Sequence, residues 1–233
     1  MGARAAFSAR SGGVSEAPFD TLNLGILTGD DRDAVSENRR RLAAALGLEA
    51  ERVLMGFQVH GAEVAEHDGP QQPSPYAQPG SELPEVDGHA TAEPRLAPLV
   101  LVADCLPVAL AGPGGVEMLH CGWRGLADGI VARGVEAVDA VAAAIGPGVG
   151  PCCYEVGAEV LKRFADLGEG IAKGRMLDLP EVARRKLRDA GVQHVESSEL
   201  CTSCEPELFF SHRRDGEQSG RQGGLVWFEQ EAY

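Results

Sequence analysis

Two apolar runs near the middle of the chain restrict its fold most strongly. Residues 96–110 are apolar except for Asp104 and Cys105, and residues 116–121 form a second, shorter run. Runs of this kind are typical of strands that are buried on both faces of a sheet. Because helices must cover such a sheet, we expect a layered α/β to α+β fold with a mixed central β-sheet flanked by helices.

Hydrophobic periodicity and turn signals predict further elements, which are helices over residues 33–46, 126–144, 154–167 and 181–190 and strands over residues 53–64 and 224–228. The strand over residues 53–64 is interrupted at residues 58–61. Residues 68–85 are rich in proline and glutamine, which predicts an exposed loop. Periodic structure resumes on both sides of this loop. We therefore expect a single domain over residues 1–233.

The composition argues against several classes of partner. The chain of 233 residues carries a formal net charge of -14, so it offers no electrostatic footprint for nucleic acid or for an anionic membrane surface. No stretch approaches the roughly 20 apolar residues of a membrane span, and residues 1–10 lack the apolar segment of a secretory signal. We expect a cytoplasmic protein whose partner is a small molecule.

The six cysteines are too few to hold a chain of this length together by disulfides. Cys201 and Cys204 form a CxxC pair, and Cys152 and Cys153 are adjacent. A second CxxC that would complete a structural zinc site is missing. The simplest interpretation is that the thiols are reduced and that residues 201–204 form a buried turn with small apolar side chains.

Three predicted strand ends carry side chains that are able to bind a metal ion or to take part in catalysis. His60 lies in the segment 58–61, Cys105 follows Asp104 in the first apolar run, and His120 lies at the end of the second run. Two imidazoles and one thiol suffice for an open zinc site or for a cysteine nucleophile with its base, and the spacing leaves both open. Asp104 must be paired or hydrogen-bonded, since an isolated buried carboxylate is costly.

The other four histidines are weaker candidates for this chemistry. We expect His67 and His194 at the surface, whereas His89, which follows a turn, fits either a surface or a buried setting. His212 lies in a basic tripeptide and fits an anion contact or a surface group better than a metal ligand.

Six short motifs follow one another along the chain, namely Gln58-Val59-His60-Gly61, Ala103-Asp104-Cys105-Leu106-Pro107, His120-Cys121-Gly122-Trp123-Arg124-Gly125, Ile145-Gly146-Pro147, Tyr154-Glu155-Val156-Gly157 and Phe210-Ser211-His212-Arg213-Arg214-Asp215. In this order, and over nearly the whole chain from Asn23 to Trp227, they resemble the YfiH family. The family is also labelled the polyphenol oxidase or laccase-domain family, the purine nucleoside phosphorylase family and the peptidoglycan-editing-factor family. The resemblance implies the YfiH fold, which is similar to that of the cytotoxic necrotizing factor toxins.

The departures from the family pattern are modest. Cys121 stands where the family commonly has a small residue such as alanine, and the proline-rich loop is long. By this resemblance, His60, Cys105 and His120 are the ligands of a mononuclear zinc site. Three protein ligands leave the fourth tetrahedral position to water or substrate, and zinc lowers the pKa of bound water to roughly 7.

The resemblance implies phosphorolysis of adenosine, inosine and methylthioadenosine to the base and a ribose 1-phosphate, together with deamination of adenosine. For the phosphate it points to Arg39, because a guanidinium fork binds phosphate bidentately, with Arg124 and the pair Arg213-Arg214 as fallbacks. The alternative for Arg39 is a solvated charge on a helix surface. Asp87 or Asp104 is the candidate acid that assists departure of the base, although Asp104 is also a candidate for orienting a ligand.

Other functions remain open. The older family label implies a copper oxidase of phenols, and the same site would take copper in vitro, but six histidines are too few for a blue copper centre and a multicopper cluster. A metal-free hydrolase, with Cys105 as nucleophile and His120 as base, fits the likeness to deamidating toxins and includes an amidase that edits peptidoglycan precursors. A binding protein without activity is least favoured, because Cys, His and Arg concentrate at strand ends.

Overall fold

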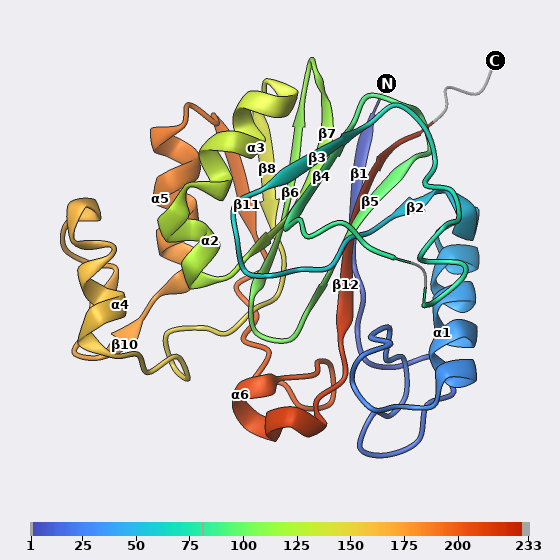
Figure 1. Cartoon of the computed structure of the whole chain (residues 1–233). Helices are drawn as coiled ribbons and strands as arrows, with labels where there is room; N and C mark the ends of the chain where they lie inside the picture. Colours follow the sequence, from blue (N-terminus) through green and yellow to red (C-terminus); the bar gives the residue numbers. More distant parts are fainter. Residues whose placement is uncertain (1, 81, 230–233) are drawn as a thin grey trace.

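The computed structural model describes residues 2–80 and 82–229, and in it two mixed sheets pack face to face between helices (Figure 1). The larger sheet has the strand order β11-β8-β6-β7-β4-β3, with bounds His194–Ser197, Ala142–Ile145, Leu106–Gly112, Gly115–Cys121, Gly88–Thr91 and Val64–His67. Its pairs β3/β4 and β8/β11 are parallel and the other pairs are antiparallel.

The smaller sheet has the order β1-β12-β5-β2, with bounds Ala3–Phe7, Gln222–Phe228, Ala97–Val102 and Val53–Leu54. Here β2 runs parallel to β5, and β12 is antiparallel to both β1 and β5. A separate antiparallel pair joins β9, Ala172–Lys173, to β10, Met176–Leu177.

The helices lie on the outer faces of the two sheets and at one end of them. Their bounds are α1 Arg32–Ala45, α2 Trp123–Asp128, α3 Ile130–Val138, α4 Ala158–Lys162, α5 Leu179–Asp189 and α6 His212–Asp215, with short 3-10 turns at Ala50–Arg52, Ala165–Leu167 and Gly216–Gln218. In Figure 1, α1 lies beyond the smaller sheet, and α2, α3 and α5 lie beyond the larger one. The Asp31 side chain caps α1 by accepting a hydrogen bond from the Ala34 backbone N–H at 2.9 Å.

Three apolar clusters hold these layers together. The largest joins the larger sheet to α2, α3 and α5, and a second joins the smaller sheet to α1. A third fills the space between the sheets and includes Val102 of β5, Met118 of β7 and Val226 of β12. The predicted layered fold with a mixed sheet flanked by helices is therefore confirmed, whereas the second sheet was not predicted.

The apolar run 96–110 is divided between the two sheets. β5 ends at Val102 in the smaller sheet, and β6 begins at Leu106 in the larger one. Between them the backbone turns at Asp104, whose φ of 88° lies in the left-handed region that few residues other than glycine adopt. The crossing therefore places Asp104 and Cys105 where the two sheets separate.

Three other predicted elements were wrong in extent. The helix expected over residues 126–144 is broken at Gly129, whose φ is 93°, and its last part is strand β8. The alanine-rich segment pairs with β6 and β11, so sheet contacts override its helix propensity. The strand expected over residues 53–64 has the predicted interruption at residues 58–61, but the interruption is wider, because β2 ends at Leu54 and β3 begins only at Val64. The helix expected over residues 154–167 shortens to α4 and one 3-10 turn.

The loop expected over residues 68–85 is mostly exposed or partly exposed among its described residues, but its middle is buried. Ser74, Pro75 and Tyr76 are buried, and Tyr76 belongs to the cluster beneath α1. The Tyr76 hydroxyl donates a hydrogen bond to the Arg39 backbone carbonyl at 2.8 Å. One aromatic ring thus anchors the middle of an otherwise polar segment.

Within the part of the chain that the structure describes, none of the helices has the length and apolar character needed to cross a membrane.

Candidate active site

Antiparallel pairing of β6 with β7 brings the predicted thiol and one predicted imidazole together. Leu106 pairs with Cys121 and Pro107 pairs with His120, so Cys105 at the start of β6 lies beside the end of β7. His60 arrives from the loop that follows β2, with a φ of 61°. The ligand atoms of His60, Cys105 and His120 all lie within 4.8 Å of one another. The three residues singled out by the sequence therefore form one cluster.

Asp87 holds both histidines of this cluster. Its Oδ1 accepts a hydrogen bond from His120 Nδ1 at 2.7 Å and from the His60 backbone N–H at 3.0 Å. Its Oδ2 accepts from the Gly61 backbone N–H at 2.7 Å. With Nδ1 of His120 donating to the carboxylate, Nε2 of that ring carries the lone pair for a ligand or a proton. Burial by itself raises the pKa of Asp87, but the interaction with His120 outweighs this effect and lowers the pKa.

Asp87 is fully buried and is not among the residues that line the cleft described below. Sequence reasoning placed it near the substrate as a candidate acid, whereas its contacts in the structure are with the histidine loop and His120. This geometry favours a positioning role for Asp87.

The cluster packs tightly against Gly122, which precedes α2. A Cβ at this position would lie 3.1 Å from both Cys105 Sγ and His60 Cδ2. The His60 and His120 rings meet edge to face, with centroids 4.8 Å apart and planes at 70°. The backbone of residue 122 thus forms one wall of the cluster.

The electrostatics of the cluster favour a thiolate beside an imidazolium. Burial by itself raises the pKa of Cys105, but the His120 and His60 imidazoles lower it to about 6. Burial by itself lowers the pKa of His120, but Cys105 and Asp87 raise it to about 9. A thiolate is the form that ligates a metal and also the form that acts as a nucleophile. The charge distribution therefore suits both chemistries that the sequence leaves open.

Asp104 is paired, as expected for a buried carboxylate. Its Oδ1 accepts from the Thr202 hydroxyl at 2.6 Å, and its Oδ2 accepts from the Arg213 backbone N–H at 2.5 Å. Its backbone carbonyl accepts from the Val149 N–H at 2.8 Å. These bonds stabilise the unusual backbone conformation that directs Cys105 into the cluster.

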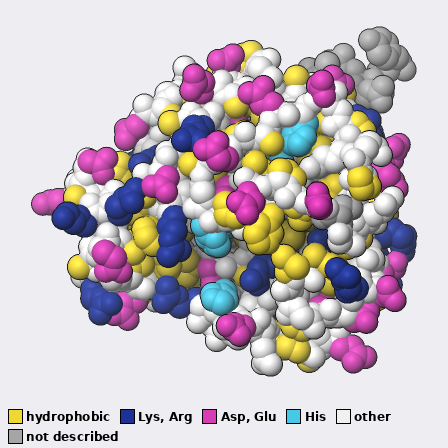
Figure 2. All heavy atoms as spheres, in the orientation of Figure 1, with side chains coloured by type: hydrophobic (Ala, Val, Ile, Leu, Met, Phe, Trp, Pro, Cys, Tyr) yellow, Lys and Arg dark blue, Asp and Glu magenta, His cyan; other side chains and the backbone are white. Residues whose placement is uncertain are grey.

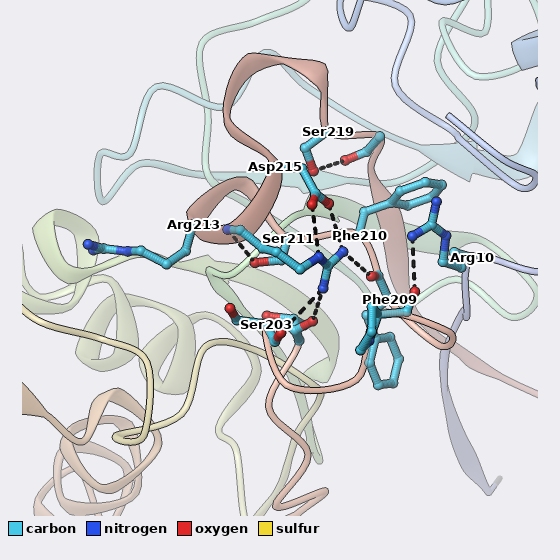
Figure 3. Close-up of polar contacts among 12 residues, drawn as sticks. Arg10, Ser203, Phe209, Phe210, Ser211, Arg213, Asp215 and Ser219 are labelled. Atoms are coloured by element: carbon cyan, nitrogen blue, oxygen red, sulfur yellow. Dashed lines mark hydrogen bonds and ion pairs between the residues drawn. The ribbon is translucent and has the colours of Figure 1, made fainter. Parts of the chain in front are cut away.

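The two arginines after His212 have different roles. The Arg214 guanidinium donates to the backbone carbonyls of Thr202 and Phe209, at 2.9 and 3.0 Å, and pairs with Asp215. Figure 3 shows Arg213 extending away from this network. Its guanidinium carbon lies 5.2 Å from the ring centroid of Tyr154. Of this pair, Arg213 lines the cleft described below, whereas Arg214 stabilises the turn.

A cleft of about 760 Å³ opens above the cluster. Its basic side chains come from distant parts of the chain and are Arg39, Arg124, His212, Arg213 and Arg221. Its apolar and aromatic walls include Phe57, Trp123 and Tyr154. Figure 2 shows basic side chains and histidines gathered in the lower centre of one face, toward the end at which α6 lies. In a chain with a net charge of -14, this concentration of cations favours an anionic ligand.

Arg39 is buried rather than solvated, so the helix-surface alternative for this residue was wrong. Its side chain donates from Nε to the Leu24 carbonyl at 2.9 Å and from Nη1 to the Pro75 carbonyl at 3.0 Å. Nη2 is buried and has no hydrogen-bond partner among the described residues, although Arg39 lines the cleft. Burial lowers the pKa of Arg39 to about 10, which still leaves it charged at neutral pH.

Sequence reasoning missed one basic residue of the cleft. Arg221 precedes β12, and its Nη1 donates to the Ser219 carbonyl at 2.7 Å. Its signal in the sequence is weak, because it is a lone arginine between a polar turn and the predicted strand 224–228.

Two expectations for residues outside the cleft were wrong. His67 is partly buried and its Nε2 lies 3.1 Å from His89 Nδ1, so these two rings form a pair that is separate from the His60, Cys105 and His120 group. The turn 201–204 is not a buried apolar turn, because Cys204 is exposed and Cys201 is half-buried. Their thiols lie with those of Cys152 and Cys153 in a second group.

The fold and the site together define a class: a two-sheet α+β protein with a His-Cys-His cluster at the base of a basic cleft. The family model described as multi-copper polyphenol oxidoreductase laccase matches residues 4–229. The chain therefore belongs to this family, whose members include the YfiH and YlmD proteins.

Two relatives illustrate the similarity in sequence. Purine nucleoside phosphorylase YlmD of Geobacillus stearothermophilus is 37% identical over 246 residues, covering 97% of this chain and 90% of the relative. Purine nucleoside phosphorylase YfiH of Escherichia coli strain K12 is 36% identical over 239 residues, covering 97% of this chain and 94% of the relative. The likeness therefore extends over nearly the full length of both chains.

Solved structures show the same fold. The crystal structure of YlmD from Geobacillus stearothermophilus superimposes with a TM-score of 0.89 at 37% identity, covering 98% of this chain and 93% of the other. A hypothetical protein YfiH from Bacillus licheniformis gives a TM-score of 0.89 at 33% identity, with 97% and 93% coverage.

Proposed function

We propose that this chain is a metal-dependent purine nucleoside phosphorylase that also deaminates adenosine. The observation that carries the proposal is the presence, in one cleft, of a three-donor His-Cys-His cluster and a buried arginine with an unpaired Nη2. The names of the relatives YlmD and YfiH support the first activity. Adenosine, inosine and methylthioadenosine are the substrates we propose.

The donor set fits zinc. His60 and His120 offer nitrogen and Cys105 offers sulfur, which are the ligand atoms that zinc prefers, and Asp87 fixes the orientation of His120 from behind. A three-ligand site is typical of catalytic zinc, which acts as a Lewis acid and lowers the pKa of bound water. The same donor set would take copper in vitro.

The basic residues of the cleft have a specific task in phosphorolysis. Inorganic phosphate must be held beside the ribose C1′ while the bond to the base breaks. Arg39 presents Nη2 from a fixed position, because its Nε and Nη1 are already bonded to backbone carbonyls. Arg124 and Arg213 line the same cleft and would add positive charge at the phosphate. We therefore assign phosphate binding to Arg39 first.

We assign the binding of the purine base to a different part of the cleft from that of the phosphate. Trp123 and Tyr154 line the cleft, and each ring carries an arginine against it, Arg124 at 4.6 Å and Arg213 at 5.2 Å from the ring centroid. A flat heteroaromatic base stacks favourably on such surfaces. These residues would orient the nucleoside with its ribose toward the phosphate site.

A metal-free hydrolase is the second candidate, and one observation favours it. His120 lies between the low-pKa thiol of Cys105 and the carboxylate of Asp87, which is the order of a nucleophile, its base and an orienting acid. An amidase that edits peptidoglycan precursors would use this arrangement. A multicopper oxidase receives less support, since His67 and His89 pair with each other and are not among the residues that line the cleft.

The direct test of the proposal is product analysis with the purified protein. Incubation with adenosine, inosine or methylthioadenosine should release the free base only when inorganic phosphate is present, with one sugar 1-phosphate formed per base. Adenosine should also yield inosine without phosphate. Release of base at the same rate without phosphate would contradict phosphorolysis.

A further inference from the structure

The second group of cysteines lies on the turns beside the catalytic cleft. Cys152 and Cys153 follow β8, and Cys201 and Cys204 precede α6. All four Sγ atoms lie within 4.8 Å of one another, and Cys204 Sγ is 3.4 Å from both Cys152 Sγ and Cys153 Sγ. Residues about 50 positions apart thus converge on one point, and all four cysteines are free.

The separations match a metal centre better than a disulfide. Four sulfurs at about 2.3 Å from a tetrahedral zinc lie about 3.8 Å from each other, whereas a disulfide requires about 2.05 Å. Two of the observed separations are 3.4 Å and all lie within 4.8 Å, which is compatible with the tetrahedral value and longer than a disulfide bond. The adjacent pair Cys152-Cys153 supplies two ligands in place of a second CxxC. The turn that carries this pair folds against the turn that carries Cys201 and Cys204.

The surrounding backbone supports a negatively charged sulfur cluster. The Gly150 N–H donates to Cys201 Sγ at 3.2 Å, and an amide donor of this kind stabilises a thiolate. The Arg214 guanidinium donates to the carbonyl of Thr202, inside the same turn, at 2.9 Å. The Gly150 contact thus supplies a hydrogen-bond donor to the cluster, and Arg214 holds the turn that carries Cys201 and Cys204.

We propose that Cys152, Cys153, Cys201 and Cys204 bind a second metal ion, a structural Zn²⁺ held by four thiolates. Binding deprotonates the thiols and releases their protons to solvent. Four protein ligands close the coordination sphere, which is typical of a structural site. The ion would tie the turn after β8 to the turn before α6, and it would thereby hold Thr202 on Asp104 and Tyr154 at the wall of the cleft. This proposal does not depend on which reaction the cleft catalyses.

The test is metal content of the full chain purified under reducing conditions, measured by elemental mass spectrometry. We expect about two zinc ions per chain in the unchanged protein and about one in Cys105→Ala/His120→Ala, which retains the four-cysteine cluster. We expect about one zinc ion per chain in Cys152→Ser/Cys204→Ser. Ser203→Ala, in the same turn, is the matched control and should keep both ions.

Cobalt substitution identifies the ligands of the remaining ion, even where a cysteine variant fails to fold. Cobalt-loaded Cys105→Ala/His120→Ala should show the intense thiolate-to-metal charge transfer and visible bands of a tetrahedral tetrathiolate centre. Absence of a bound ion from this variant would overturn the proposal, and so would an intact mass showing a disulfide among the four cysteines in protein purified under reducing conditions.

Discussion

Arg39 combines properties that rarely occur together in one side chain. It is 2% exposed, it carries a charge, and three of its contacts are backbone carbonyls rather than a carboxylate. Burying a cation without a counterion is costly, so buried charges are normally paired. The missing counterion would be the phosphate of the proposed reaction.

Replacement of Arg39 by alanine should therefore reduce phosphorolysis more than deamination. Hydrogen bonds to charged groups contribute about 1.5–3 kcal/mol, so we expect the kcat/KM for phosphate to fall about 10- to 100-fold. The rate of inosine formation from adenosine should change little. Arg40→Ala is the matched control, because Arg40 is exposed and pairs with Glu37. Equal loss of both activities in Arg39→Ala would contradict the phosphate role.

Asp87 should act on the active-site metal through His120. An Asp87→Asn change removes the negative charge behind Nδ1 and should weaken metal affinity about 10- to 100-fold, as loss of such an orienting partner typically does. The measurement is the chelator concentration that halves activity. Glu85→Gln, at an exposed carboxylate two residues earlier, should leave that concentration unchanged. If Asp87→Asn tolerates chelator as well as the unchanged protein, Asp87 does not support the metal.

The turn between β7 and α2 is the element whose shape the cluster depends on most closely. Gly122→Ala would place a methyl group 3.1 Å from Cys105 Sγ and His60 Cδ2, and it should reduce activity at least about tenfold by displacing one ligand. Circular dichroism should show an unchanged fold. Gly69→Ala, where a Cβ meets nothing within 4 Å, is the control. Full activity of Gly122→Ala would show that the cluster tolerates the displacement.

The hydrophobic pattern of the sequence predicted those elements that are stabilised mainly by contacts between residues close together in the chain. The helix expected over residues 33–46 is α1, and the helix over residues 181–190 is α5. The pattern failed where distant strands decide the outcome, as in the alanine-rich β8, which is a strand because β6 and β11 lie on either side of it. Tyr76 shows the same limit, since a single buried ring was hidden in a polar segment.

In the candidate site, too, the residues that lie in local motifs could be predicted, whereas those that depend on distant contacts could not. His60, Cys105 and His120 could be predicted, because each lies in a motif at a strand end and the family resemblance joined them. The role of Asp87 and the inclusion of Arg221 could not be predicted, because both depend on contacts made across the fold. The grouping of the four cysteines also depends on two turns that meet only in the folded chain.

The interior of the whole molecule contains one carboxyl group that should govern its stability at neutral pH. Glu117 of β7 is fully buried, and neither of its carboxyl oxygens has a hydrogen-bond partner among the described residues. Burial, with a smaller contribution from Glu66, raises its pKa from the ordinary 4.5 to about 8. The folded protein therefore holds a proton that the unfolded chain has released over this range.

The sign of the effect follows from proton linkage. The native state binds more protons than the unfolded state between pH 4.5 and 8, so this contribution to the free energy of unfolding is complete below 4.5 and is lost as the pH rises to 8. We expect Glu117→Gln to remove a slope of up to about 1.4 kcal/mol per pH unit. Urea denaturation across this range measures it, with the exposed Glu136→Gln of α3 as control. Parallel pH profiles for Glu117→Gln and the unchanged protein would contradict the assignment.

Metal depletion and restoration test whether His60, Cys105 and His120 bind a catalytic metal or whether Cys105 acts as a catalytic nucleophile. The rate of phosphorolysis of inosine is measured after chelator treatment and again after zinc is added back. We predict loss of activity on depletion, recovery with zinc, and no recovery in Cys105→Ala. Full activity in the depleted protein, together with an inactive Cys105→Ala variant, would contradict the account and establish Cys105 as a nucleophile.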